Sequence, residues 1–223
     1  MKQVAQNFNT GEIKVLDVPV PALQPGCVLV RVEASLLSAG TEKSKVDLGR
    51  KSLVGKAQAR PDLVAQVLSK VKTEGVAATV QTVRNRLDSW SPLGYSCAGV
   101  VERVAPGVSA FRAGDRVACA GAEIAVHAGY VCVPELLCSK IPDGVVSADA
   151  AYTTVGCVAM NGVRQAGVAY GERVLVIGLG LIGRITLQLL RASGCAVAGV
   201  DVSPRAVEGA RDGGCDLALP ADA

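Results

Sequence analysis

The amino-acid sequence predicts an α/β protein in which a β-rich part with a helical insert is followed by the first part of a doubly wound parallel sheet. Three observations favour this fold class: β-branched, strand-like segments before residue 41 and again from 97 to 134, helical periodicity between them, and a strand, glycine-rich turn, helix and strand after residue 172. We expect two domains, 1–150 and 151–223, with the helical insert at about 42–91.

Composition indicates a folded globular protein and excludes several functional classes. Half of the 223 residues are hydrophobic, and the net charge of +3 is too small to indicate a nucleic-acid partner. No stretch of about 18 apolar residues is present, and the N-terminus lacks the apolar core of a signal peptide. We therefore expect a cytoplasmic protein with no membrane partner.

The eight cysteines do not form a recognisable metal or disulfide pattern. No two of them are spaced as C-x-x-C, and most lie within apolar, strand-like segments such as Tyr130–Val133. We expect them to be buried small apolar side chains in a reducing compartment.

The β-rich part contains several short segments of strand character. Turn signals containing proline and glycine, such as Gln24–Gly26, separate them. The predicted strand segments are Glu12–Pro19, Cys27–Ala34, Cys97–Val104, Asp115–Ala120 and Tyr130–Pro134.

The insert has the pattern of a helical hairpin. Pro61 lies in the first turn of one helix, and the second helix carries the apolar stripe Val76, Val80, Val83 and Leu87. Residues 42–90 contain ten lysines and arginines against five acidic residues, so the insert carries +5 and the rest of the chain −2. This charge indicates either a solvated helix face or a basic rim that recruits an anionic substrate or an adjoining domain.

A glycine motif near the C-terminal end predicts a dinucleotide site of the Rossmann type. Gly178, Gly180 and Gly183 follow the apolar strand Arg173–Ile177 and open a helix. These glycines allow a tight turn, close approach of the backbone to a pyrophosphate, and close packing of helix on strand. The free N–H groups of Leu181, Ile182 and Gly183 are then available to the phosphates.

Asp201 completes this predicted site. It ends the next apolar strand, 18 residues after Gly183, where a carboxylate can accept hydrogen bonds from the hydroxyls of the adenosine ribose. The same carboxylate would repel a 2′-phosphate, so we expect NAD rather than NADP, although Arg205 lies four residues further on.

These features resemble the medium-chain dehydrogenase/reductase family, the relatives of zinc-type alcohol dehydrogenases. Besides the glycine motif, the resemblance is carried by Glu12–Pro19, Pro92–Val101, Gly107–Val117 and Ile141–Gly144. It implies a GroES-like β domain followed by a cofactor domain, with a small-molecule substrate bound between them. It covers the whole chain except the helical insert.

The positions that correspond to the zinc ligands of this family hold other residues. Ser38 and Ala39 precede the Gly40–Glu42 segment where a cysteine is expected, Tyr95 replaces the histidine of a Gly-His-Glu motif, and the third ligand position falls near Thr154. The four-cysteine lobe of the structural zinc is also absent from the sequence. Because catalytic zinc needs three convergent ligands, we expect no metal site.

Without zinc, hydroxyl or backbone donors must stabilise an oxyanion. Tyr95 and Thr41 are our candidate catalytic residues, because they match the positions of the zinc-binding histidine and the proton-relaying hydroxyl of the family. Tyr95 could instead fill the vacated metal site, and Thr41 could cap the following turn. His127, the only histidine, is either a packed or hydrogen-bonded side chain or a proton-transfer group on the substrate side.

The resemblance implies a zinc-independent, NAD(P)-linked oxidoreductase that moves a hydride between nicotinamide and a carbonyl or alcohol. The Ser38–Glu42, Lys51–Ala57 and Pro92–Ser96 segments resemble a zinc-lacking subgroup fused ahead of a second oxidoreductase domain, in which sugar derivatives are the suspected substrates. Two alternatives stay open: a quinone-reductase-like enzyme, and a non-catalytic cofactor-binding module that supports a partner domain.

The number of strands predicts that the chain is part of a larger assembly. A complete doubly wound domain has about six parallel strands, and only Arg173–Ile177, Ala196–Val200 and a third candidate at Asp216–Leu219 are countable. We therefore expect a fragment that is inactive alone and is completed by a homo-oligomeric partner or by further sequence, such as a fused second oxidoreductase domain.

Overall fold

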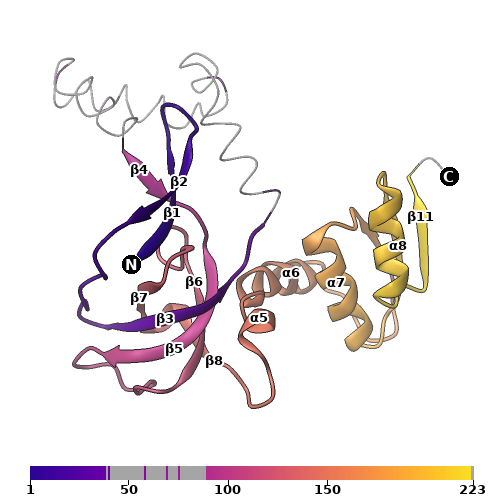
Figure 1. Cartoon of the computed structure of the whole chain (residues 1–223). Coiled ribbons are helices and arrows are strands. Elements are labelled where there is room, and N and C mark those ends of the chain that lie inside the picture. The colour runs from indigo at the N-terminus through magenta and orange to yellow at the C-terminus, as the bar shows by residue number, and fades with distance from the viewer. Residues whose placement is uncertain (39, 41–57, 59–68, 70–74, 76–88, 222–223) are drawn as a thin grey trace. The chain divides into compact units, whose positions relative to one another are not determined.

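The computed structural model describes residues 1–38, 40, 58, 69, 75 and 89–221, which form two compact units, Met1–Ala151 and Tyr152–Ala223. Most of the predicted helical insert, including its Val76, Val80, Val83 and Leu87 stripe and the adjacent Thr41, lies outside the described residues. None of the helices in the described part is long and apolar enough to cross a membrane. Figure 1 shows the element order.

The first unit is built from two antiparallel sheets. One sheet has the order β2-β1-β4 and the other the order β7-β3-β5-β6-β8. The strands are β1 (Lys2–Asn7), β2 (Ile13–Asp17), β3 (Cys27–Ser35), β4 (Trp90–Pro92), β5 (Ser96–Val104), β6 (Arg116–Ala120), β7 (Tyr130–Pro134) and β8 (Cys138–Lys140). The 3-10 turn η1 (Glu135–Leu137) and the short helix α5 (Ser147–Ala150) complete this unit.

A short strand lies at the end of the predicted insert. Trp90 and Ser91 belong to strand β4, which the sequence did not predict. They pair with Asn7 and Gln6 of β1 in antiparallel register. Sequence periodicity could not reveal this, because a three-residue strand is specified by its partner rather than by its own pattern.

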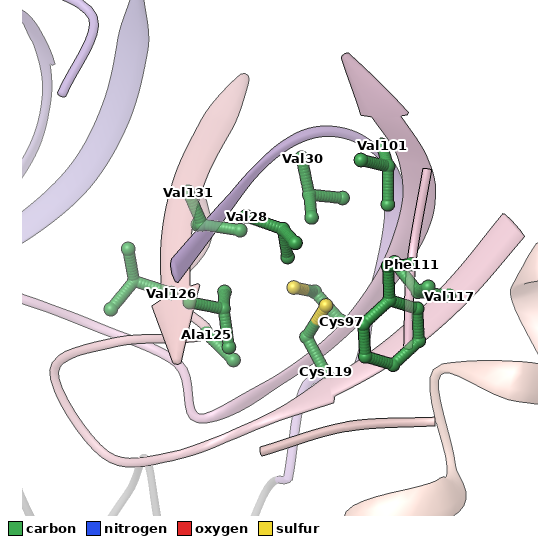
Figure 2. Packing of buried hydrophobic residues seen from close by; sticks show 11 residues of the cluster. Val28, Val30, Cys97, Val101, Phe111, Val117, Cys119, Ala125, Val126 and Val131 are labelled. Carbon is green, nitrogen blue, oxygen red and sulfur yellow. The ribbon is translucent and has the colours of Figure 1, made fainter. Parts of the chain in front are cut away.

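The core of the first unit is made of valines, alanines and cysteines on facing strands. In β3 the four residues Cys27–Val30 are all buried, and β5 and β7 direct their own valines to the same core. Figure 2 shows this cluster, in which the sulfurs of Cys97 and Cys119 lie among the valines. The prediction of buried thiols is confirmed for Cys27, Cys97, Cys119 and Cys195, whereas Cys157 is exposed.

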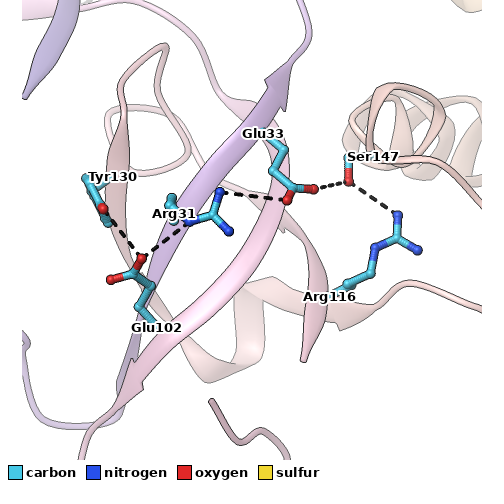
Figure 3. A network of polar contacts seen from close by, with 6 residues as sticks. All are labelled: Arg31, Glu33, Glu102, Arg116, Tyr130 and Ser147. Atoms are coloured by element: carbon cyan, nitrogen blue, oxygen red, sulfur yellow. Dashed lines mark hydrogen bonds and ion pairs between the residues drawn. The ribbon is translucent and has the colours of Figure 1, made fainter. Parts of the chain in front are cut away.

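A row of polar contacts crosses the outer face of the larger sheet (Figure 3). Arg31 Nε lies 3.3 Å from Glu102 Oε1, and the Tyr130 hydroxyl donates to the same oxygen at 3.4 Å. Glu33 Oε2 accepts a hydrogen bond of 2.7 Å from the Ser147 hydroxyl. These contacts link β3, β5 and β7 and attach the first residue of α5 to the sheet.

The second unit is a parallel sheet with helices. Its elements are α6 (Thr153–Gln165), β9 (Arg173–Ile177), α7 (Leu181–Ala192), β10 (Ala196–Asp201), α8 (Pro204–Asp212) and β11 (Leu217–Pro220). The sheet order is β11-β10-β9 with both pairs parallel, so the third strand candidate of the sequence is a strand. Leu187 and Leu190 of α7 and Val207 of α8 pack against its buried positions.

The opposite face of this sheet carries exposed apolar side chains. Leu175 and Ile177 of β9 are 57% and 81% exposed, and Leu217 and Leu219 of β11 are 53% and 38% exposed. Alternate residues of a strand point to opposite faces. The described helices therefore cover one face of the sheet and leave these four side chains open to solvent.

Asp115 connects the loop before β6 to β8. Its side chain is only 13% exposed, its Oδ2 accepts from the Arg112 N–H at 3.0 Å, and Lys140 Nζ lies 2.9 Å away. The hydrogen bond to Lys140, followed by that from Arg112, lowers the pKa of this carboxyl below its ordinary value. Its contribution to stability is therefore complete above the unfolded-state pKa of about 4 and is lost as pH falls through the lower folded-state value.

We predict that Asp115→Asn lowers the Tm by a few degrees at neutral pH, because it removes the ion pair with Lys140. The difference in Tm from the unmodified protein should shrink as pH falls from about 4, the unfolded-state pKa, through the lower folded-state pKa, at which the carboxyl of the folded protein becomes protonated. Thermal unfolding followed by circular dichroism from neutral to acidic pH tests this. Asp17→Asn is the matched control. Asp17 pairs with Lys2 at a site where both side chains are about 70% exposed, so this substitution should change Tm little. A Tm difference for Asp115→Asn that persists unchanged at acidic pH would contradict the assignment.

Candidate functional site

The glycine-rich turn between β9 and α7 has the geometry that a pyrophosphate site needs. Gly178 adopts φ +91°, a conformation that residues with a Cβ rarely adopt. Leu179 is fully buried beneath the turn, and Gly180 is the N-cap of α7 with extended backbone. The chain therefore turns sharply at Gly178 and enters helix α7 three residues later, at Leu181.

Gly183 is required for helix and strand to approach each other. A Cβ at this position would lie 1.8 Å from the carbonyl oxygen of Gly178, which is far inside contact distance. At Gly180, in contrast, a Cβ would meet no atom within 4 Å. Packing thus requires a glycine at position 183, whereas position 180 faces open space and could hold a larger residue without a clash.

The first turn of α7 leaves backbone donors at this open position. The first intrahelical bond runs from the Arg184 N–H to the Gly180 carbonyl at 2.9 Å. The N–H groups of Leu181, Ile182 and Gly183 precede it and have no intrahelical acceptor. Because α7 is 12 residues long, its dipole adds to the attraction of these donors for an anion.

Asp201 lies directly beside the turn. Its Oδ2 accepts from the Leu179 N–H at 2.6 Å and its Oδ1 from the Ser203 N–H at 2.7 Å. These bonds, first that from Ser203 and then that from Leu179, lower the pKa of Asp201, so its charge is retained well below neutral pH. The carboxylate is held in one orientation and, with about four acceptor positions in total, keeps some for a further donor.

The neighbourhood of Tyr95 in the first unit contains a second group of polar residues. Tyr95 is half-buried between β4 and β5, and its carbonyl accepts from the Gly121 N–H at 3.0 Å. Its neighbour Ser96 is buried and donates to the Ala151 carbonyl at 2.6 Å. Ser96 therefore anchors the start of β5 to the end of α5.

His127 is held against the residue that precedes Tyr95. Its ring Nδ1 lies 2.9 Å from the Ser35 hydroxyl, and its backbone N–H donates to the Leu93 carbonyl at 2.8 Å. Gly94 has φ +98°, and a Cβ there would lie 2.8 Å from the His127 nitrogen and 3.0 Å from Nδ1. The glycine makes room for the imidazole, and the backbone places Ser35, Tyr95 and His127 on adjoining segments.

Sequence reasoning identified part of this arrangement. It singled out His127 and Tyr95 but not Ser35, which lies 92 residues from His127 along the chain. Thr41 lies outside the described residues, and Thr154 belongs to α6 of the second unit. Within the residues that the structure describes, no group of three or more histidine, cysteine or acidic side chains is placed to hold a metal ion.

Comparison with known proteins identifies the first unit. Residues 64–143 match the model of the alcohol dehydrogenase GroES-like domain. The chain is 29% identical over 206 residues to an alcohol dehydrogenase of Geobacillus stearothermophilus, which covers 76% of this chain and 60% of the relative. It is 31% identical over 155 residues to human sorbitol dehydrogenase, which covers 57% of this chain and 43% of the relative. The chain therefore spans about half the length of the curated relatives it matches.

A solved structure shows the same fold. A quinone oxidoreductase of Pseudomonas syringae superposes with a TM-score of 0.70 at 23% identity, covering 97% of this chain and 57% of that protein. The expected architecture, a GroES-like β domain followed by a partial Rossmann domain, is thus the fold of this chain. Together, the matched domain and the similar dehydrogenases support the medium-chain dehydrogenase/reductase family for this chain, and the solved structure shows that it shares the fold.

Proposed function

We propose that this chain is the substrate domain and the adenosine-binding half of the cofactor domain of a zinc-independent, NAD-linked oxidoreductase. The observation that carries the proposal is the turn at Gly178–Gly183 with the Asp201 carboxylate fixed 2.6 Å from its Leu179 N–H. When bound, a nicotinamide dinucleotide accepts hydride from an alcohol or delivers it to a carbonyl.

The residues of this turn fit such a cofactor. The free N–H groups of Leu181, Ile182 and Gly183 would hold the pyrophosphate, and the open space at Gly180 allows the backbone to approach it. Asp201 would accept hydrogen bonds from the ribose hydroxyls. Its lowered pKa is consistent with this role, because the ionised carboxylate has only acceptor positions to offer to the ribose hydroxyls.

The substrate side would work through hydroxyl and imidazole groups rather than zinc. The positions that correspond to zinc ligands in the family hold Ser38, Ala39, Tyr95 and Thr154, none of which provides the thiolate or imidazole that zinc prefers. We propose that Tyr95 and Thr41 donate to the substrate oxygen. The hydrogen bond between His127 and Ser35 supports a proton-transfer role for His127, because it fixes the orientation of the ring.

We propose a polyol or another sugar derivative as the substrate class. Sorbitol and alcohol dehydrogenases are among the relatives of the chain, which supports an alcohol or carbonyl at the reacting carbon. We further propose that the complete protein includes additional sequence or a partner chain that supplies the rest of the cofactor domain, such as a second oxidoreductase domain or a second copy.

The experiment that tests this function uses the chain purified together with the additional sequence or partner chain that supplies the rest of its cofactor domain. It is assayed with NAD⁺ and a panel of polyols, and with NADH and the matching ketoses, by nicotinamide absorbance. We expect turnover with at least one pair and less than one zinc per ten chains by elemental analysis. Cofactor binding without turnover on any member would instead indicate a non-catalytic module, and turnover restricted to quinones would indicate a quinone reductase. About one zinc per chain would contradict zinc independence.

A pair of alanine substitutions separates folding from cofactor binding. Gly183→Ala should lower the free energy of unfolding by about 3 kcal/mol, because the new methyl group collides with the Gly178 carbonyl. Gly180→Ala should leave the Tm nearly unchanged and weaken NADH binding by roughly tenfold or more, because its methyl group occupies the space of the pyrophosphate. Thermal unfolding and calorimetric titration of both variants give the answer. Unweakened NADH binding by Gly180→Ala would place the cofactor elsewhere.

Asp201 should determine the choice between NADH and NADPH. We expect the unmodified protein to bind NADH more tightly, and Asp201→Asn to narrow the difference by improving NADPH binding. The amide keeps an oxygen acceptor for the Leu179 N–H, so the turn should be retained. Asp212→Asn, at the end of α8, is the charge-matched control. Tighter binding of NADPH by the unmodified protein would show that Arg205 outweighs Asp201.

A further inference from the structure

Three cysteines lie in register across neighbouring strands of the larger sheet. Cys97 of β5 pairs with Cys119 of β6, and Cys119 pairs with Cys138 of β8. We call Cys97, Cys119 and Cys138 the cysteine ladder. Cys119 lies at its centre, and its Sγ is 3.9 Å from the Sγ of Cys138.

The backbone of this ladder already has the spacing of a disulfide. Residues directly opposite each other in an antiparallel pair have Cα atoms about 4.5–5.5 Å apart. Disulfides span Cα separations of about 4.4–6.8 Å. The two sulfurs of Cys119 and Cys138 therefore need only side-chain rotation to move from 3.9 Å to bonding distance.

Access distinguishes the two possible pairs of the ladder. Cys97 is completely buried, and Cys119 is 2% exposed. Cys138 is half-buried on the edge strand of the sheet, which makes it the most accessible of the three ladder cysteines. Cys27 and Cys132 are also neighbours, but they pair with Pro134 and Leu29 rather than with each other.

We propose that Cys119 and Cys138 form a reversible disulfide by exchange with a small-molecule disulfide of the glutathione type. The Cys138 thiolate attacks one sulfur of oxidised glutathione, which forms a mixed disulfide and releases one glutathione thiolate. The Cys119 thiolate then attacks Cys138 Sγ, which closes the protein disulfide and releases the second glutathione. The two cysteines are oxidised and oxidised glutathione is reduced to two glutathione thiols. The two cysteine protons pass through solvent to the released glutathione thiolates.

The surroundings of the two thiols make this exchange slow at neutral pH. The hydrogen bond to Cys119, followed by burial, raises the pKa of the Cys138 thiol above its ordinary value. The thiolate is the reacting species, so the rate of closure should increase as pH rises. The pair would respond to sustained rather than brief oxidation.

Closure of this bond would constrain the segment that carries His127. Residues 120–137 would become a loop closed at both ends by one covalent bond, and this loop includes Gly121, which donates to the Tyr95 carbonyl, and His127, which contacts Ser35. The conformational freedom of the loop that carries His127 would therefore depend on the redox state of the surrounding thiols. The inference itself stands on the ladder geometry and does not depend on the proposed function.

The test is incubation of the purified protein with oxidised glutathione at about pH 8, followed by alkylation of the remaining thiols, intact mass measurement and peptide mapping. We expect a peptide pair joined through Cys119 and Cys138, which dithiothreitol separates again, and a mixed disulfide with glutathione at the exposed Cys157. Modification of Cys157 proves that the oxidant was active. If Cys119 and Cys138 are both still free thiols that become alkylated, while Cys157 carries glutathione, the proposal is overturned.

Single serine substitutions identify the partners independently. Cys138→Ser should abolish the internal disulfide, whereas Cys157→Ser should still form it, since Cys157 lies in the second unit. Cys97→Ser is the matched buried control and should also retain it. A joined pair of Cys97 and Cys119 in the unmodified protein, or loss of the disulfide in Cys97→Ser alone, would show that the other step of the ladder is the reactive one.

Discussion

The burial of small side chains in thin cores is the constraint on which both units depend. Only 3% of the residues are aromatic, so valine, alanine, leucine and cysteine must exclude water from the faces of the sheets. Small side chains bury little area each, and they stabilise a core only if the backbones approach closely. This constraint explains why a thiol ladder lies inside the first unit and why a glycine stands where α7 meets β9.

The close approach at Gly183 sets the position of the first turn of α7 in the second unit. Because helix and strand are nearly in contact there, the first turn of α7 lies just beyond the carboxyl end of β9. The parallel register of β9 and β10 ends with Val200 opposite Ile177, which places Asp201 at the same edge. The close packing of helix and strand and the position of the unbonded N–H groups of α7 are thus consequences of one geometry.

In the first unit, main-chain hydrogen bonds between loops and strand ends bring the polar residues together. Main-chain hydrogen bonds from His127 to Leu93, and from Gly121 to Tyr95, hold loops against the strand ends. Such bonds position the imidazole next to the Ser35 hydroxyl.

The sequence by itself determined the features that depend on local pattern: strands β2, β3, β5, β6 and β7 of the first part, the glycine turn, and the spacing from Gly183 to Asp201. Alternation and glycine placement are set by neighbours in the chain, so they are readable from it. Only the tertiary structure decided the contacts between distant segments. Strand β4 exists because β1 offers it a partner, Ser35 meets His127 across 92 residues, and Cys119 faces Cys138 because β6 and β8 are in register. Strand register is set by the packing of whole sheets, which no local window of sequence contains.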